Sequence, residues 1–115
     1  MPGNVTARDE RRRHARIALA CPVRVQRNDR RTEGRLVDLS LGGASLRAPT
    51  DAPYALGERL SLEIDLPGLE DPVEIDAVVR WVDAIDTARI GVQFATGLRP
   101  REVYAVNQLA RRQQG

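Results

Sequence analysis

Apolar and polar residues alternate along most of this chain, which is the pattern of β-strands with one buried face. A first strand is predicted from apolar residues of one parity: Ile17, Leu19, Cys21, Val23 and Val25. Its partner opens after the turn residues NDRR (28–31) and runs from about Gly34 to Leu41.

The second strand is expected to turn Val37, Leu39 and Leu41 towards the core. The pair Gly42-Gly43 interrupts it, and a short strand resumes and ends before Pro49.

Three later segments repeat the alternation: LSLEIDL (60–66), VEIDAVVRWVD (73–83) and RIGVQFA (89–95). In the middle one, Val79 and Trp81 share the inward parity with the preceding apolar residues. About six short antiparallel strands at this spacing favour a small barrel or sandwich, and closure removes exposed strand edges. From Pro100 the apolar spacing becomes helical, which predicts one terminal helix over about 100–112.

Length and composition bound the class of protein. The 115 residues suit one domain, and 42% hydrophobic with 30% charged residues is an ordinary globular mixture. We expect a cytoplasmic protein without membrane insertion, because no apolar run approaches the ~20 residues that span a bilayer and the start lacks a secretory signal. Cys21 is the single cysteine and is expected in the core.

Charge is distributed unevenly despite a net value of +2. Residues 1–47 carry eleven arginines and five acidic residues, whereas residues 48–98 carry three arginines and ten acidic residues. All eighteen basic residues are arginine, which a general compositional bias explains without function. Arginine nevertheless binds phosphate or a guanine edge through two parallel hydrogen bonds, as lysine does not.

Asp38 and Ser40 form a candidate binding patch. If Val37 and Leu39 face inward, these two side chains point outward together, just before Gly42-Gly43. Either glycine is able to adopt a positive φ and to admit another molecule close to the backbone. A carboxylate accepts from the N1–H and N2–H donors of guanine, while arginine donates to O6 and N7. The arginine cluster 11–16 and this patch together are complementary to a guanine nucleotide.

Two motifs make the sequence similar to a known family. RRRHAR (11–16) places Arg12 and Arg16 in an RxxxR arrangement, and DLSLGG (38–43) matches DxSxxG. VVRWVD and RIGVQF look like the late strands of the same family. Residues 10 to about 110 resemble a PilZ domain, the bacterial receptor module for cyclic di-GMP.

The resemblance implies a mainly β fold: a six-stranded antiparallel barrel (about 17–96), a C-terminal α-helix and a flexible N-terminal arm (1–9), with the PilZ domain over 10–115. It also implies ligand roles. Arg12 and Arg16 would contact phosphate and guanine, Asp38 and Ser40 would hold a guanine edge, and Gly43 would leave room for it. A basic residue at Arg11 goes with two intercalated ligand molecules per domain rather than one.

Secondary ligand candidates are Arg13, Gly42 and Trp81. The inward parity of Trp81 favours core packing, with contact to a base at the barrel rim as the alternative. Ligand binding is expected to order the N-terminal segment that carries the arginine cluster 11–16 over the barrel, because the ligand neutralises the repulsion between these arginines. The changed surface would then act on an unidentified downstream protein to regulate motility, biofilm or exopolysaccharide output.

Other functions are less well supported by the residues. We expect no enzyme, no cofactor and no metal site: His14 lies in the arginine cluster without a base–orienter pair, and no His, Cys and acid cluster has ligand spacing. Non-specific nucleic-acid binding by the basic arm is one alternative, although only 3% of residues are aromatic. A PilZ-fold adaptor that contacts proteins but no nucleotide is the other.

Overall fold

The computed structural model describes residues 16–114 of the chain. This part forms seven strands and one helix. In chain order they are β1 (Ile17–Ala18), β2 (Pro22–Arg27), β3 (Arg30–Leu39), β4 (Gly43–Arg47), β5 (Arg59–Ile64), β6 (Val73–Val82), β7 (Arg89–Phe94) and α2 (Pro100–Gln114).

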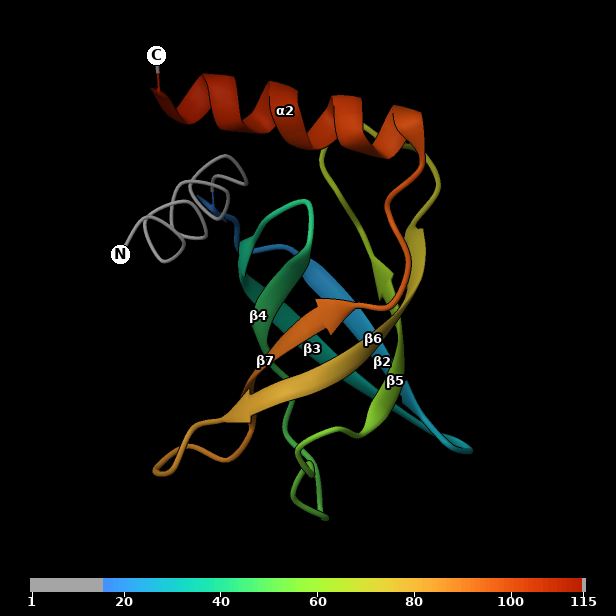
Figure 1. Ribbon diagram of the computed structural model, residues 1–115, viewed down its shortest axis with the longest axis vertical. Coiled ribbons are helices and arrows are strands. Elements are labelled where there is room, and N and C mark those ends of the chain that lie inside the picture. The colour runs from blue at the N-terminus through green and yellow to red at the C-terminus, as the bar shows by residue number, and fades with distance from the viewer. Residues whose placement is uncertain (1–15, 115) are drawn as a thin grey trace, which may run out of the picture.

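Six of the strands close into a barrel. Neighbours are antiparallel in the order β3-β2-β5-β6-β7-β4, and β4 pairs back onto β3. Figure 1 shows these strands around one interior, with α2 lying across one end. The predicted mainly β fold, a six-stranded antiparallel barrel with a C-terminal helix, is therefore confirmed.

The predicted first strand is divided in two. β1 pairs with the end of β3, through Ile17 opposite Leu39, and β2 pairs with its beginning. Between them the backbone stays bonded to β3, since Leu19 N–H donates to Val37 O at 3.2 Å. β1 is thus an additional short strand beside the barrel and is not one of the six strands that close it.

The barrel interior contains the hydrophobic core that the alternation predicted. Its largest fully buried side chains are Ile17, Leu36, Leu39, Leu46, Leu62, Ile64, Ile90, Val23, Val25, Val73 and Val79. Cys21 is also buried, and burial raises the pKa of its thiol.

Two β-bulges correct the predicted inward faces of β3 and β6. In β3 the register shifts between Leu36 and Asp38, so Leu36 is buried and Val37 is 36% exposed, whereas we predicted Val37 inside. In β6 the register shifts between Val79 and Trp81, and Trp81 is 40% exposed. The prediction of Trp81 as a core residue is therefore wrong. One extra residue reverses the parity of everything after it.

Helix α2 begins where local signals place it. Pro100 occupies its first turn, and the backbone N–H of Arg99 donates to the Glu102 carboxylate at 2.9 Å, which is half of a capping box. At the other end, the Gln113 side chain donates to the Ala18 carbonyl in β1. The helix is thereby attached beside the strand that follows Arg16. No helix among residues 16–114 is long and apolar enough to cross a membrane.

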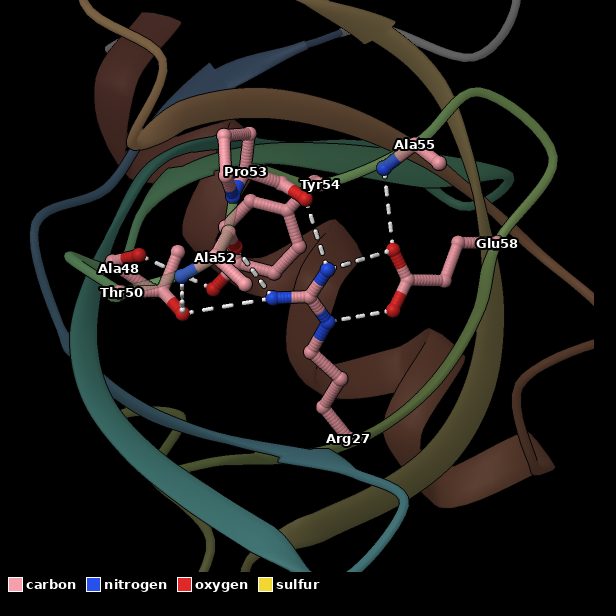
Figure 2. Close-up of polar contacts among 8 residues, drawn as sticks. All are labelled: Arg27, Ala48, Thr50, Ala52, Pro53, Tyr54, Ala55 and Glu58. Carbon is pink, nitrogen blue, oxygen red and sulfur yellow. Dashed lines mark hydrogen bonds and ion pairs between the residues drawn. The ribbon is translucent and has the colours of Figure 1, made fainter.

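The loop between β4 and β5 is held by Arg27 at the end of β2 (Figure 2). Its guanidinium donates to both oxygens of Glu58 and to the carbonyls of Ala52 and Pro53, and it stacks 4.7 Å from the Tyr54 ring centre. The hydrogen bond from Arg27 lowers the pKa of Glu58. β3 runs from this end of the barrel to Asp38 near its other end, so the cluster is remote from the motif residues.

Candidate functional site

A row of cross-strand neighbours on the outer barrel surface brings motif residues together. Asp38 in β3 lies opposite Ser45 in β4, Ser45 opposite Gly91 in β7, and Gly91 opposite Trp81 in β6. The two bulges determine this row, because they turn Asp38 and Trp81 onto the outside. Bulges often reorient side chains in this way beside functional sites.

Arg16 and Asp38 join the two sequence motifs directly. Arg16 Nη1 donates to Asp38 Oδ1 at 2.7 Å, across 22 residues of sequence. The backbone N–H of Ser45 donates to the same oxygen at 3.2 Å. The Arg16 side chain is 58% exposed and that of Asp38 is 27% exposed, so both are accessible to a ligand.

Ser40 does not share the exposed patch that we predicted for it with Asp38. It is only 7% exposed, and its hydroxyl donates to the Gly43 carbonyl at 3.3 Å. The Ser40 backbone N–H donates to the same carbonyl at 2.9 Å. In this structure Ser40 closes the turn between β3 and β4.

The two glycines of the motif differ in their surroundings. Neither has a positive φ; among the glycines of residues 16–114 only Gly57 and Gly68 do, and the predicted use of a positive φ at Gly42 or Gly43 is wrong. A Cβ at Gly43 would collide with the Val92 carbonyl of β7. Gly43 is thus required for the close pairing of β4 and β7, while a Cβ at Gly42 would meet no atom within 4 Å.

Trp81 lies across Gly91. A Cβ on Gly91 would overlap Nε1, Cε2 and Cδ1 of the indole, so only glycine leaves space for the ring. The indole covers the barrel wall and keeps part of its surface open to solvent. Of the two alternatives for Trp81, burial in the core and an exposed position, the structure therefore shows the exposed position.

These residues border a hollow of about 200 Å³. Its lining residues are Arg16, Ser40, Gly42, Gly43, Ala44, Arg80, Trp81, Gly91, Val92 and Gln93. Asp38 stands at its side, bonded to Arg16. Guanidinium, carboxylate and indole around one hollow offer an anion contact, an acceptor for paired N–H donors and an aromatic surface.

Sequence reasoning missed several neighbours of this hollow. Arg80 is the extra residue of the β6 bulge, and its Nε donates to the Gln93 side chain at 2.7 Å. Gly91 was considered only as part of the strand RIGVQF and given no role at the site, and Ser45 entered no motif. The adjacent letters R-W in VVRWVD and the glycine in RIGVQF were the available signals, but which strand faces meet there depends on register.

Three predicted ligand residues, Arg11, Arg12 and Arg13, lie outside the described residues. So does His14. Of the predicted site residues, the described part of the chain thus places Arg16, Ser40, Gly42, Gly43 and Trp81 in the lining of the hollow, and Asp38 is bonded to Arg16.

A larger hollow of about 430 Å³ lies over β2, β5 and β6. Arg24 in its wall is bonded to Glu63 and Asp65, and these bonds lower the pKa of both carboxyls. Its guanidinium is therefore already occupied. The smaller hollow, in contrast, is lined by residues of both motifs.

Among residues 16–114 no group of three or more His, Cys, Asp or Glu side chains is arranged to hold a metal ion.

Comparison with known proteins identifies the fold and the family. The PilZ domain family model matches residues 10–112. Alginate biosynthesis protein Alg44 of Pseudomonas syringae pv. tomato is 39% identical over 94 residues, covering 75% of this chain and 23% of that protein. This chain therefore spans about a quarter of Alg44.

Solved structures agree in fold. The Bacillus subtilis inhibitor of motility MotI/DgrA has a TM-score of 0.72 and 23% identity, over 88% of this chain and 50% of that one. The PilZ domain of YcgR from Escherichia coli, solved with c-di-GMP, has a TM-score of 0.66 and 24% identity, over 90% and 95%. With a family match over nearly the whole sequence and the same barrel in these structures, the chain belongs to the PilZ domain family.

Proposed function

We propose that this chain is a receptor for cyclic di-GMP and binds it on the outer barrel surface beside Arg16, Asp38 and Trp81. The observation that carries the proposal is the 2.7 Å contact between Arg16 and Asp38. It joins the RxxxR and DxSxxG motifs at one hollow. PilZ domains are regulatory binding domains rather than catalytic ones, so the proposed output is a changed surface.

The chemistry of the pair suits a guanine nucleotide. Asp38 accepts hydrogen bonds from a guanidinium, a group of planar N–H donors, and the N1–H and N2–H edge of guanine presents donors of the same kind. A guanine that takes this carboxylate releases Arg16 to donate to O6 and N7 or to a phosphate. The ligand would thus exchange one charge-assisted contact for several.

The preceding arginines extend the proposal. Arg11 and Arg12 lie outside the described residues, and the family resemblance assigns them to phosphate, guanine and a second ligand molecule. A bound dianion would neutralise repulsion among these arginines and order the segment. The ordered segment would be presented to a partner protein. Among similar proteins are an inhibitor of motility and an alginate biosynthesis protein, and we propose an output of one of these kinds.

The charges of the described barrel favour this proposal over non-specific nucleic-acid binding. Many of its arginines are paired with carboxylates, among them Arg24, Arg27, Arg31 and Arg47. Paired guanidinium groups have little charge left for a polyphosphate backbone. A pocket for one small dianion needs only a few unpaired donors.

Calorimetric titration with cyclic di-GMP, cyclic di-AMP and GTP tests the proposal. We expect selective binding of cyclic di-GMP. Arg16→Ala should cost about 2–3 kcal/mol of binding, because a charge-assisted interaction is lost. Its melting temperature should stay near that of the wild type, since the Arg16 side chain is 58% exposed.

Arg59→Ala is the matched control, an exposed arginine on β5 away from the hollow, and it should bind like the wild type. Equal affinity for all three nucleotides, with binding that collapses at moderate salt, would instead indicate the nucleic-acid alternative. No binding of cyclic di-GMP at all would leave the adaptor alternative.

A further inference from the structure

Ser45 has a hydroxyl to which the proposed function gives no role. It is 2% exposed, and its Oγ is the one buried side-chain polar atom without a hydrogen-bond partner in the described part of the chain. A buried hydroxyl without a partner destabilises the fold, and such groups in native proteins call for an explanation.

The side chain of Ser45 lies on the outer, ligand-facing side of the barrel wall. Its strand neighbours Ala44 and Leu46 are buried in the barrel interior at 1% and 0% exposure. Alternation along β4 therefore directs Ser45 to the opposite face. Its burial on that face comes from what covers it, in the row that also contains Asp38, Gly91 and Trp81.

Asp38 is one neighbour of the Ser45 hydroxyl. Directly opposed residues on one face have Cβ atoms about 4.5–5.5 Å apart, within reach of a hydroxyl and a carboxylate. Within residues 16–114, the two hydrogen bonds that Asp38 accepts, from Arg16 and from the Ser45 backbone, both go to Oδ1. In this part of the chain Oδ2 has no donor.

The indole of Trp81 is the other neighbour. Its Nε1 lies where a Cβ of Gly91 would be, and Gly91 is the residue directly opposite Ser45. The indole N–H therefore takes the place of the side chain that residue 91 lacks, facing Ser45. Indole Nε1 is a donor only, whereas a hydroxyl both donates and accepts.

We propose that Ser45 is a positioning residue of the nucleotide site, a role that rests on the proposed function. When a guanine replaces Arg16 on Asp38, Trp81 Nε1–H donates to Ser45 Oγ, and the Ser45 hydroxyl donates to Asp38 Oδ2. This hydrogen-bond chain fixes the carboxylate plane and the indole together. The Ser45 hydroxyl, which has no partner among the described residues, then gains its partners on binding.

Ser45→Ala tests this inference, and the wild type tests the function on which it rests. Removal of the hydroxyl should weaken cyclic di-GMP binding about five- to tenfold, as loss of a hydrogen bond does. The melting temperature should stay the same or rise by a few degrees, because a buried polar group without a partner is removed. A purely structural serine would give the change in stability without the change in affinity.

Ser61→Ala is the matched control. Ser61 is an exposed serine on β5, bonded to Asp76 at 2.9 Å and remote from the row. Its variant should bind like the wild type. Trp81 is the only tryptophan, so its fluorescence reports on the indole directly. The ligand-induced change should be smaller in Ser45→Ala than in the wild type.

A double-mutant cycle with Trp81→Phe identifies the path, because phenylalanine lacks the N–H donor. In that background Ser45→Ala should cost clearly less affinity than in the wild type. Wild-type binding with an unchanged affinity in Ser45→Ala overturns the positioning role alone. A wild type that does not bind cyclic di-GMP overturns the proposed function, and the inference with it.

Discussion

Replacing Gly91 with alanine tests whether the indole of Trp81 packs on the barrel wall as the structure shows. The added Cβ would overlap three atoms of the ring, so the indole has to leave its position over β7. Gly42→Ala is the matched control. Gly42 lines the same hollow, has no positive φ, and its Cβ would meet no atom within 4 Å.

The size of the effect follows from the covered surface of the indole. Trp81 is 40% exposed, so more than half of it is covered. A fully buried tryptophan side chain removes about 150–250 Å² of surface from water. Because Trp81 is only partly covered, we take about 100 Å² as the surface that becomes exposed when the ring moves out. At about 25 cal/mol per Å² this is about 2.5 kcal/mol. Alanine restricts the unfolded chain and returns about 0.5 kcal/mol. The net loss is about 2 kcal/mol.

Thermal unfolding and intrinsic fluorescence measure this change. We expect Gly91→Ala to lower the melting temperature by about 8 °C and to shift the emission of the single tryptophan to the red. Gly42→Ala should change neither, or stabilise the fold by a few tenths of a kcal/mol. If both variants melt and fluoresce alike, the ring does not lie across Gly91, and the described site is wrong.

Further predictions concern the scaffold. Arg27→Met should reduce the free energy of unfolding by about 3 kcal/mol, because Glu58 and two loop carbonyls lose charge-assisted donors. Its ligand affinity should stay unchanged. Denaturant unfolding measures the first quantity and calorimetry the second. Gly43→Ala should destabilise the protein by about 2–3 kcal/mol, since its Cβ collides with the Val92 carbonyl and spreads the β4–β7 pair; an unchanged melting temperature contradicts this. Arginine hydrogen bonds lower the pKa of Glu58, Glu63 and Asp65. The contribution of these carboxylates to stability is present above their unfolded pKa of about 4 and is lost as pH falls through their lower folded pKa values. The free energy of unfolding should therefore be flat above about pH 5 and decrease below pH 4. The decrease should be less steep in Arg24→Gln.

Much of the barrel was predictable because its strands alternate regularly. β5 buries every second residue, β7 buries its alternating apolar residues with Gly91 covered as well, and the closing pair β3–β4 follows from the need to cover strand edges. The helix was predictable from local chemistry at Pro100 and Glu102, which act within one turn. These features depend on a residue and its near neighbours in sequence, and a single sequence contains that information.

The arrangement of the site depended on contacts that no local pattern contains. The predicted partnership of Asp38 with Ser40 assumed unbroken alternation from Val37 to Leu41. The bulge before Asp38 sets it opposite Ser45 of the next strand, whereas β3 ends at Leu39 and Ser40 is buried in the turn that follows. The chemistry of the motif was therefore predictable, but its geometry was not.

The bulge in β6 explains why the side chain of Trp81 lies outside the barrel and not in the core. A tryptophan in a regular strand with inward parity would be buried, and the alternation through Val79 predicted this. The bulge at Arg80 costs β6 a regular pairing with β7 and leaves a large aromatic side chain partly in water. Neither change stabilises the isolated barrel, and Gly91 is needed as well to accommodate the ring. Two irregularities in different strands, β3 and β6, both turn side chains towards the same outer row. Stability alone gives no reason for that coincidence, whereas the proposed ligand, in contact with both Asp38 and Trp81, would need this arrangement.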